Sequence, residues 1–139
     1  AIAKKSKNKR AVKNEESFTL WVESHLDIMK GDYDGAKKRL SLLKEMASNE
    51  SDPKKYDDYY NLMGMASLMS GNAPLGVEYF EKVVGQSNIY FQYFKGLAYK
   101  AQGNTTRAKE IFQHVATHNF NTLIYSTVRN RALEEVAKG

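Results

Sequence analysis

The sequence predicts an all-α protein made of stacked antiparallel helix hairpins, and three observations lead to this fold class. Apolar residues recur at spacings of three and four in each segment, as in amphipathic helices, and no alternating strand pattern occurs. Glycine and asparagine pairs separate these segments at regular places. A pattern of two glycines and a phenylalanine also recurs 32 residues later: Gly64, Gly71 and Phe80 return as Gly96, Gly103 and Phe112. Internal periods of this size are typical of stacked helical hairpins.

The glycines of the repeat have two predicted roles. Gly64 and Gly96 fall in the middle of helices, where glycine costs about 1 kcal/mol relative to alanine. We therefore expect close helix approach there, with the small residue twelve positions further on, Gly76 or Ala108, as the partner. The glycines at 71 and 103 follow the last apolar residue of a helix, where a left-handed residue ends it without a Cβ penalty.

The first predicted hairpin spans about residues 15–48. Its first helix, about 15–30, carries an apolar stripe at helical spacing, formed by Phe18, Trp21, Val22, Leu26 and Met29. Gly31 ends this helix, and Asp32 or Asp34 caps the next one, at about 33–48. The second helix places Ala36, Leu40, Leu43 and Met46 on one face.

The second predicted hairpin spans about residues 54–85, after the loop at 49–53. Asp52-Pro53 is expected to be a cap followed by proline at the first helical position, which starts a helix at about 54–70. Pro74 opens the next helix, and Gly85 stops it.

The third predicted hairpin, about 88–118, is followed by a capping helix at about 120–138. The helix at about 88–102 is apolar nearly all round, which is typical of an interior helix. The last helix has one polar side, as solenoid ends need for solubility.

These units resemble the tetratricopeptide repeat (TPR), whose pattern runs aromatic-x2-Leu-Gly-x2-Tyr, then Ala-x3-Phe, and closes on proline. One unit has Tyr60, Met63, Gly64, Ser67, Gly76 and Phe80, and the next has Gln92, Lys95, Gly96, Tyr99, Ala108 and Phe112. A weaker third copy lies upstream, with Gly31, Ala36 and Leu40 in the corresponding places but Ser24 and Asp27 where a small residue and Tyr are expected. The closing prolines are missing, and the period is two residues short of the usual ~34. The resemblance implies a right-handed superhelical array of three hairpins, and the alternative is a non-repeat helical bundle.

Composition limits the function classes. The 139 residues contain no cysteine, which excludes disulfides, thiolate chemistry and cysteine-based metal sites. No apolar run approaches the ~20 residues of a membrane span. The chain starts with Ala, so we expect that it has been processed or trimmed. The compartment stays open: cytoplasmic, or periplasmic or otherwise extracytoplasmic if a signal has been removed.

Charge is concentrated at the N-terminus. Residues 1–14 hold six cations and no acid, while the whole chain has a net charge of +5, so the rest is near neutral at −1. We expect residues 1–14 to be a flexible basic tail and residues 15–139 to be the repeat domain. The alternatives are a tail that contacts nucleic acid or anionic lipid, and a helical extension that packs on the first repeat.

The sequence offers no chemistry that points to an enzyme. Glu110, His114 and His118 have metal-compatible spacing on one helix, but no further ligand is evident, so no metal or cofactor is expected. The paired acids at 15–16, 57–58 and 134–135 have no oriented partner and are expected to be solvated or helix-terminus charges. No nucleophile elbow or phosphate-binding glycine loop occurs.

The resemblance implies that the chain is a non-enzymatic protein-interaction module or scaffold. In the TPR family the first helix of each hairpin lines a concave groove. Matching the family's peptide-contacting positions gives a predicted groove of Trp21, His25, Asn61, Met65, Tyr93 and Leu97, with Tyr125 and Arg129 from the capping helix and Tyr90 and Lys100 beside them. The family's paired Lys and Asn clamp for a C-terminal carboxylate is absent from these positions. We therefore expect an apolar or amphipathic segment as ligand, from a partner protein or from another copy of the chain, and the alternative is an adaptor that uses its basic tail.

Overall fold

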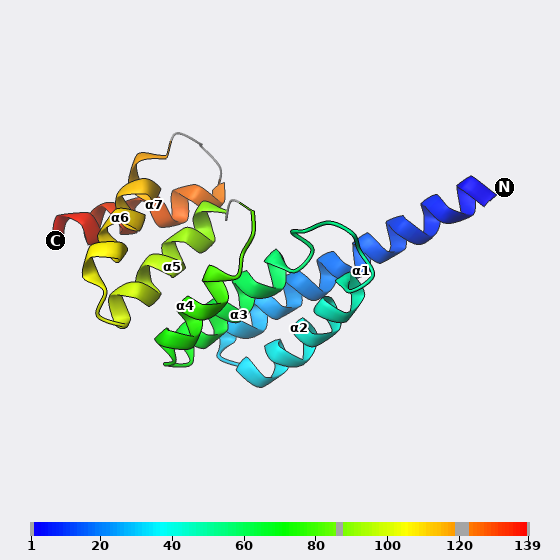
Figure 1. The fold of residues 1–139 in the computed structure, drawn as a ribbon, viewed down its shortest axis with the longest axis horizontal. Helices are drawn as coiled ribbons and strands as arrows, with labels where there is room; N and C mark the ends of the chain where they lie inside the picture. The colour runs from blue at the N-terminus through cyan, green and yellow to red at the C-terminus, as the bar shows by residue number, and fades with distance from the viewer. Residues whose placement is uncertain (1, 86–87, 119–122, 139) are drawn as a thin grey trace.

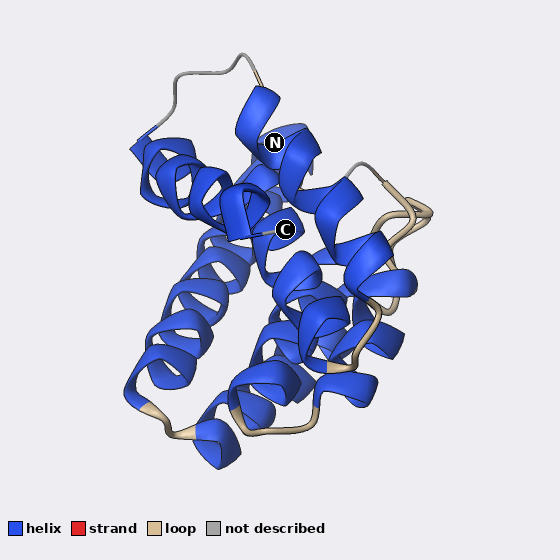
Figure 2. Cartoon of the chain, turned by 90° about the vertical axis from the view of Figure 1, so that its left-hand side faces the viewer, coloured by secondary structure: helices blue, strands red, loops and turns tan. Residues whose placement is uncertain are grey.

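The computed structural model describes residues 2–85, 88–118 and 123–138, with side chains described from Asn8 onward and, in the last helix, from Ser126 onward. Within these ranges all regular structure is helical and no strand occurs (Figure 2). The described helices are α1 (Ile2–Lys30), α2 (Tyr33–Ala47), α3 (Asp57–Met69), α4 (Ala73–Glu81), α5 (Ile89–Ala101), α6 (Thr105–Thr117) and α7 (Leu123–Lys138). The predicted all-α class is confirmed.

Neighbouring helices along the chain form the main packing units. α1 packs on α2, α3 on α4, and α5 on α6, while α7 covers α6 and one side of α5. Among the described helices, backbones come close only between helices one or two places apart in chain order, while side chains of α1 also reach α5. The molecule is therefore elongated, with the start of α1 and the end of α7 at opposite ends (Figure 1).

The three helix-ending glycines have the same geometry. Their φ angles are +83°, +92° and +94° at Gly31, Gly71 and Gly103. In each case the glycine N–H donates to the carbonyl three residues back, and the next N–H donates to the carbonyl five residues back. This is the Schellman arrangement, which satisfies carbonyls at the helix end. The residue after each glycine then caps the next helix: the side chains of Asp32, Asn72 and Asn104 each accept a hydrogen bond from the backbone N–H three residues on. The predicted turns are confirmed.

The mid-helix glycines, Gly64 and Gly96, lie against phenylalanine rings that leave no room for a side chain. A Cβ on Gly96 would lie 2.6 Å from Cε1 of Phe112, and a Cβ on Gly64 would lie 2.9 Å from the Phe80 ring. Real Cβ atoms are not found this close to other atoms, so a larger residue would displace the ring. The repeated glycine and phenylalanine are therefore parts of one packing contact.

The predicted partner of these glycines needs a partial correction. A Cβ on Gly76 would lie 3.1 Å from the carbonyl oxygen of Gly64, so α3 and α4 do approach closely at that pair. Above Gly96 the space is filled by the Phe112 ring instead of Ala108, which is itself buried. The mid-helix glycine therefore allows close approach of α3 and α4 in one hairpin, and it makes room for a phenylalanine ring in both.

The prediction of a flexible tail at 1–14 is wrong, because α1 is continuous from Ile2 to Lys30. The segment contains no glycine or proline, and its lysines, alanines and arginine are good helix formers. A helix already held by packing in its second half also avoids the cost of nucleation when it extends backward.

Two helix ends differ from the sequence prediction, and an aspartate is involved in each: Asp57 at the end of α4 and Asp52 before the start of α3. Its carboxylate accepts hydrogen bonds from the backbone N–H groups of Val84 and Gly85, both at 2.9 Å. These N–H groups are thereby drawn out of the helix, and α4 ends at Glu81 instead of near Gly85. Asp52 forms a turn by accepting from the Lys54 N–H, so α3 starts at Asp57 and not near 54. The expectation that the 57–58 acids have no oriented partner is therefore wrong for Asp57.

The core is divided between two contiguous clusters. The first, centred on α3, includes Ile28, Leu40, Leu62, Met65 and Phe80. α3 is buried along seven consecutive residues from Asn61 to Ser67, because α1, α2, α4 and α5 all contact it. The second cluster lies between α5, α6 and α7, and Tyr90, Phe94 and Tyr99 pack against both.

Candidate functional site

Side chains of α1 and α5 meet across α3, although the two helices are not direct backbone neighbours. Nε2 of His25 lies 2.8 Å from the Tyr90 hydroxyl. Trp21 stacks on the His25 ring at a centroid distance of 5.5 Å, and it meets the edge of Phe91 at 6.3 Å. Three of the predicted groove residues, Trp21, His25 and Tyr90, are thus brought together.

The electrostatics of this bridge favour a neutral imidazole. Burial lowers the pKa of His25 below the ordinary histidine value, because desolvation penalises the imidazolium. Burial also raises the pKa of the Tyr90 hydroxyl. With both groups neutral, the Tyr90 hydroxyl can donate a hydrogen bond to the imidazole nitrogen.

Three other predicted groove residues need correction, because they belong to the interior. Met65 is fully buried, and only 5% of Asn61 and 6% of Tyr93 are exposed. The first helices of the hairpins pack directly on each other, so α3 has no open inner face along these residues. A partner cannot reach these side chains in this structure.

The remaining predicted groove residues lie toward the C-terminal end. Leu97 is half-buried against the second cluster, and Arg129 is exposed on α7. Lys100 forms an ion pair with Glu135, which ties α5 to α7. The side chain of Tyr125 lies outside the described residues.

A hollow of about 470 Å³ opens where α1, the end of α2 and the start of α3 meet. Phe18, Trp21 and Tyr59 supply its aromatic lining, and Leu43 and Ala47 supply aliphatic lining. Its polar lining comes from Asn14, Ser17, Glu50, Lys55 and Asp58. The lining is therefore half apolar and half polar, a composition that suits an amphipathic ligand.

An exposed apolar stripe runs along α1 from this hollow. The exposed fractions are 67% for Phe18, 48% for Leu26 and 53% for Met29, and Val22 between them is half-buried. The sequence identified this stripe by its spacing. The side of α1 that is buried instead carries Ser24 and Ile28, with Leu20 packed beside them.

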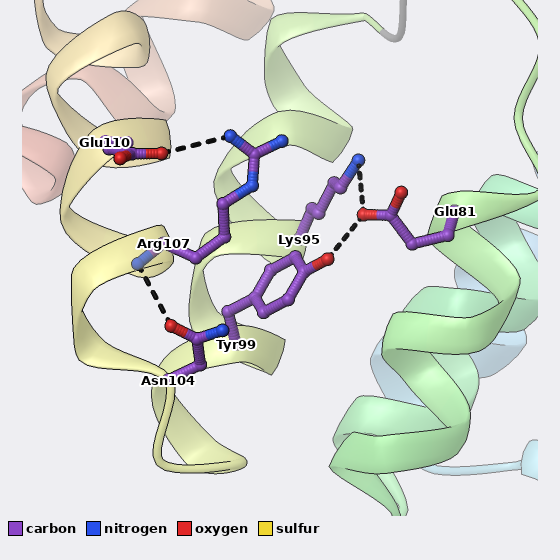
Figure 3. Close-up of polar contacts among 6 residues, drawn as sticks. All are labelled: Glu81, Lys95, Tyr99, Asn104, Arg107 and Glu110. Carbon is purple, nitrogen blue, oxygen red and sulfur yellow. Dashed lines mark hydrogen bonds and ion pairs between the residues drawn. The ribbon is translucent and has the colours of Figure 1, made fainter.

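The position of α5 beside α4 is fixed by a polar network that the sequence analysis did not foresee (Figure 3). One carboxylate oxygen of Glu81 accepts from the Tyr99 hydroxyl at 2.5 Å and from Nζ of Lys95 at 3.0 Å. Partial desolvation acts to raise the pKa of Glu81, but these two hydrogen bonds outweigh it and the pKa lies below its usual value. The Arg107 guanidinium lies 6.0 Å from the Tyr99 ring centre and pairs with Glu110.

Neither a metal-ligand cluster nor a helix able to span a membrane is present among the described residues. The rings of His114 and His118 lie 6.0 Å apart, while Glu110 pairs with Arg107. Within the described ranges, no group of three or more His, Cys, Asp or Glu side chains could hold a metal ion. None of the described helices has the length and apolar character needed to cross a membrane.

Comparison with known proteins gives no assignment: no protein-family model, curated protein or solved structure matches the chain. Any function assigned to this chain must therefore be inferred from its own residues and their geometry.

Proposed function

We propose that the chain is a non-enzymatic protein-interaction module of the TPR-like helical-repeat kind, a right-handed array of three hairpins with a capping helix. Support comes from the recurring Schellman glycine and Asx cap at Gly31, Gly71 and Gly103. The same glycine lies under the same phenylalanine in two hairpins, and the backbones of the described helices come close only between helices one or two places apart in chain order. These are the features expected of stacked repeats.

The observation that carries the binding proposal is the exposed apolar stripe of α1, which leads into the aromatic hollow at Trp21. Phe18, Leu26 and Met29 follow each other at near-helical spacing, and each is about half exposed or more. Water-facing apolar groups of this size on one helix face are typical of interaction surfaces. The partner that fits is an amphipathic helix, whose apolar face would lie along α1 and place a side chain in the hollow.

This proposal moves the binding surface relative to the predicted groove. Trp21 remains part of it through the hollow, and His25 and Tyr90 support Trp21 from behind by holding its ring in place. Aromatic and methionine side chains suit the role, because aromatics dominate interface hot spots and methionine adapts to different surfaces.

Site-specific photo-crosslinking tests the proposal. A photoreactive phenylalanine analogue at Phe18 should capture a partner through an amphipathic helical segment of that partner. The same analogue at Val84, which is 64% exposed on another part of the surface, is the matched control.

Affinity measured with the purified partner completes the test. Phe18→Asp with Met29→Asp should weaken binding at least about tenfold, because charges would enter a desolvated apolar contact. Val84→Asp with Leu133→Asp should leave the affinity unchanged. Equal affinities for the two double variants would exclude α1 as the binding surface.

A further inference from the structure

The N-terminal half of α1 projects beyond the rest of the molecule (Figure 1). Residues 2–14 extend for roughly 20 Å at the α-helical rise of 1.5 Å per residue. The side chains from Asn8 to Val12 are all exposed. A helical segment of this length has little stability of its own in water, so a second surface that packs against it would stabilise it.

Where the projecting segment meets the body, α1 and α2 enclose a groove of about 530 Å³. Four apolar side chains line it: Val12, Leu20, Leu42 and Met46. Val12 and Leu42 are 53% and 52% exposed, so the groove opens to solvent. Its floor has the apolar character of a helix-docking site.

The same groove carries negative charge. Glu15, Glu16 and Glu45 line it, and no ion pair with another described side chain neutralises any of the three. A ligand for this groove should therefore combine cations with small apolar groups. The segment that precedes the groove on α1, residues 2–11, has this composition, with five cations and two alanines.

The order of these charges along α1 makes the helix complementary to itself. Lys9 lies three residues before Val12, and Glu15 lies three residues after it. If two α1 helices run antiparallel with the Val12 residues facing each other, each Lys9 lies opposite the Glu15 of the other copy.

We propose that this groove is occupied by the α1 helix of a second copy of the chain, in a two-fold symmetric antiparallel dimer centred on Val12. The symmetry makes each favourable pair occur twice, and the same surface serves both partners. This surface combines one side of α1, around Val12 and Leu20, with α2, and it does not include the Phe18 stripe proposed to bind another protein. A polyanion fits the groove less well, because its phosphates would approach the three glutamates next to the lysines.

Sedimentation velocity on the full chain tests the proposal, with circular dichroism to show that each variant is folded. The wild-type chain should dimerise with rising concentration and dissociate as salt is added, because salt screens exposed charge pairs. Lys9→Glu, and separately Glu15→Lys, should each lower the association constant about tenfold or more, since attraction becomes repulsion at both symmetric sites.

Mixing the two charge variants is the decisive experiment, because in the heterodimer one Lys9–Glu15 pair keeps its wild-type charges and the other has both charges reversed, so that both pairs attract. Association of the mixture should recover to near the wild-type level. Lys109→Glu and, separately, Glu134→Lys, exposed positions on α6 and α7, are the charge-matched controls and should each behave like the wild type.

Three results would overturn the proposal. The first is a wild-type chain that stays monomeric at every concentration in low salt. The second is a dimer that both charge variants leave unchanged. The third is a chain that is monomeric alone and uses the same lysines to bind duplex DNA or anionic lipid vesicles, which would assign the basic segment to a polyanion.

Discussion

Gly96 shows how one residue can define a hairpin. The Phe112 ring fills the position that a Cβ would take, at 2.6 Å, so the glycine is required by packing and not by backbone conformation. Its cost in the helix is outweighed by the aromatic ring that it admits into the core.

Gly96→Ala should therefore destabilise the protein by about 1–3 kcal/mol, although alanine is the better helix former. Chemical denaturation followed by circular dichroism gives the free energy of unfolding. Combining the change with Phe112→Leu should cost less than the sum of the two single changes, because the smaller side chain makes room. Additive effects, or a stabilised Gly96→Ala variant, would show that the ring does not restrict this site.

His25 gives the protein a pH-dependent contact. Its folded-state pKa lies below the ordinary value because of burial, so the unfolded chain binds more protons than the folded chain between the two pKa values. Stability should be fully present above the unfolded pKa of about 6.5 and should decrease as the pH falls below it toward the folded pKa.

Comparing unfolding free energies at pH 7.5 and pH 5 measures this contribution. In His25→Gln the part of the pH dependence due to the imidazole should disappear. His114→Gln, on the exposed face of α6, is the control and should keep the wild-type dependence. A His25 variant that loses as much stability on acidification as the wild type would contradict the assignment.

Among the elements, α3 and α4 are joined by more than their apolar faces. Asp57 at the start of α3 holds the Val84 and Gly85 N–H groups just after α4, which closes the hairpin at its open end. A carboxylate that accepts two backbone hydrogen bonds is a stronger contact than a neutral pair.

Asp57→Ala should cost about 1–3 kcal/mol, because two partly shielded N–H groups lose their acceptor. Asp58→Ala, one residue further on, is the matched control for removing an acid from the first turn of α3, and it should cost less. The measurement is the free energy of unfolding of each variant relative to the wild type. Equal losses would mean that the effect is one of helix-terminus charge and not of the long-range hydrogen bonds.

The molecule as a whole is a chain of neighbour contacts, so its stability should vary along its length. α3 touches four other helices and is buried along seven consecutive residues, whereas α7 contacts only α5 and α6 among the described helices. Local opening in such an array is easiest where a unit has neighbours on one side only.

Hydrogen exchange followed by mass spectrometry should therefore find the slowest amides in α3 and faster exchange in α7. At concentrations too low for association, amides of residues 2–14 should exchange fastest among the helical segments. Uniform protection across all seven described helices would indicate a single cooperative unit instead of stacked repeats.

The sequence by itself determined the all-α class, the hairpin turns and the repeated glycines. These features depend on local rules, such as a left-handed glycine at a helix end, an Asx cap after it, and apolar spacing within one helix. The predicted end of α4 was wrong because a residue distant in sequence competes for the backbone N–H groups there. Asp57 ended α4 early through hydrogen bonds that span 27 and 28 residues of sequence, and no pattern within α4 signals this.

Only the tertiary structure decided which face of α1 is buried and therefore where a partner can bind. α1 has two candidate stripes, and the more apolar one, with Phe18, Leu26 and Met29, is exposed. The buried one has Ser24 at its centre, 40 residues before Gly64, in the place where the other hairpins need a small residue. Ser24 is fully buried, so a small side chain occupies this position in the interior. Helical spacing shows that a helix has an apolar stripe, but the neighbouring helices determine whether that stripe faces the core or the solvent.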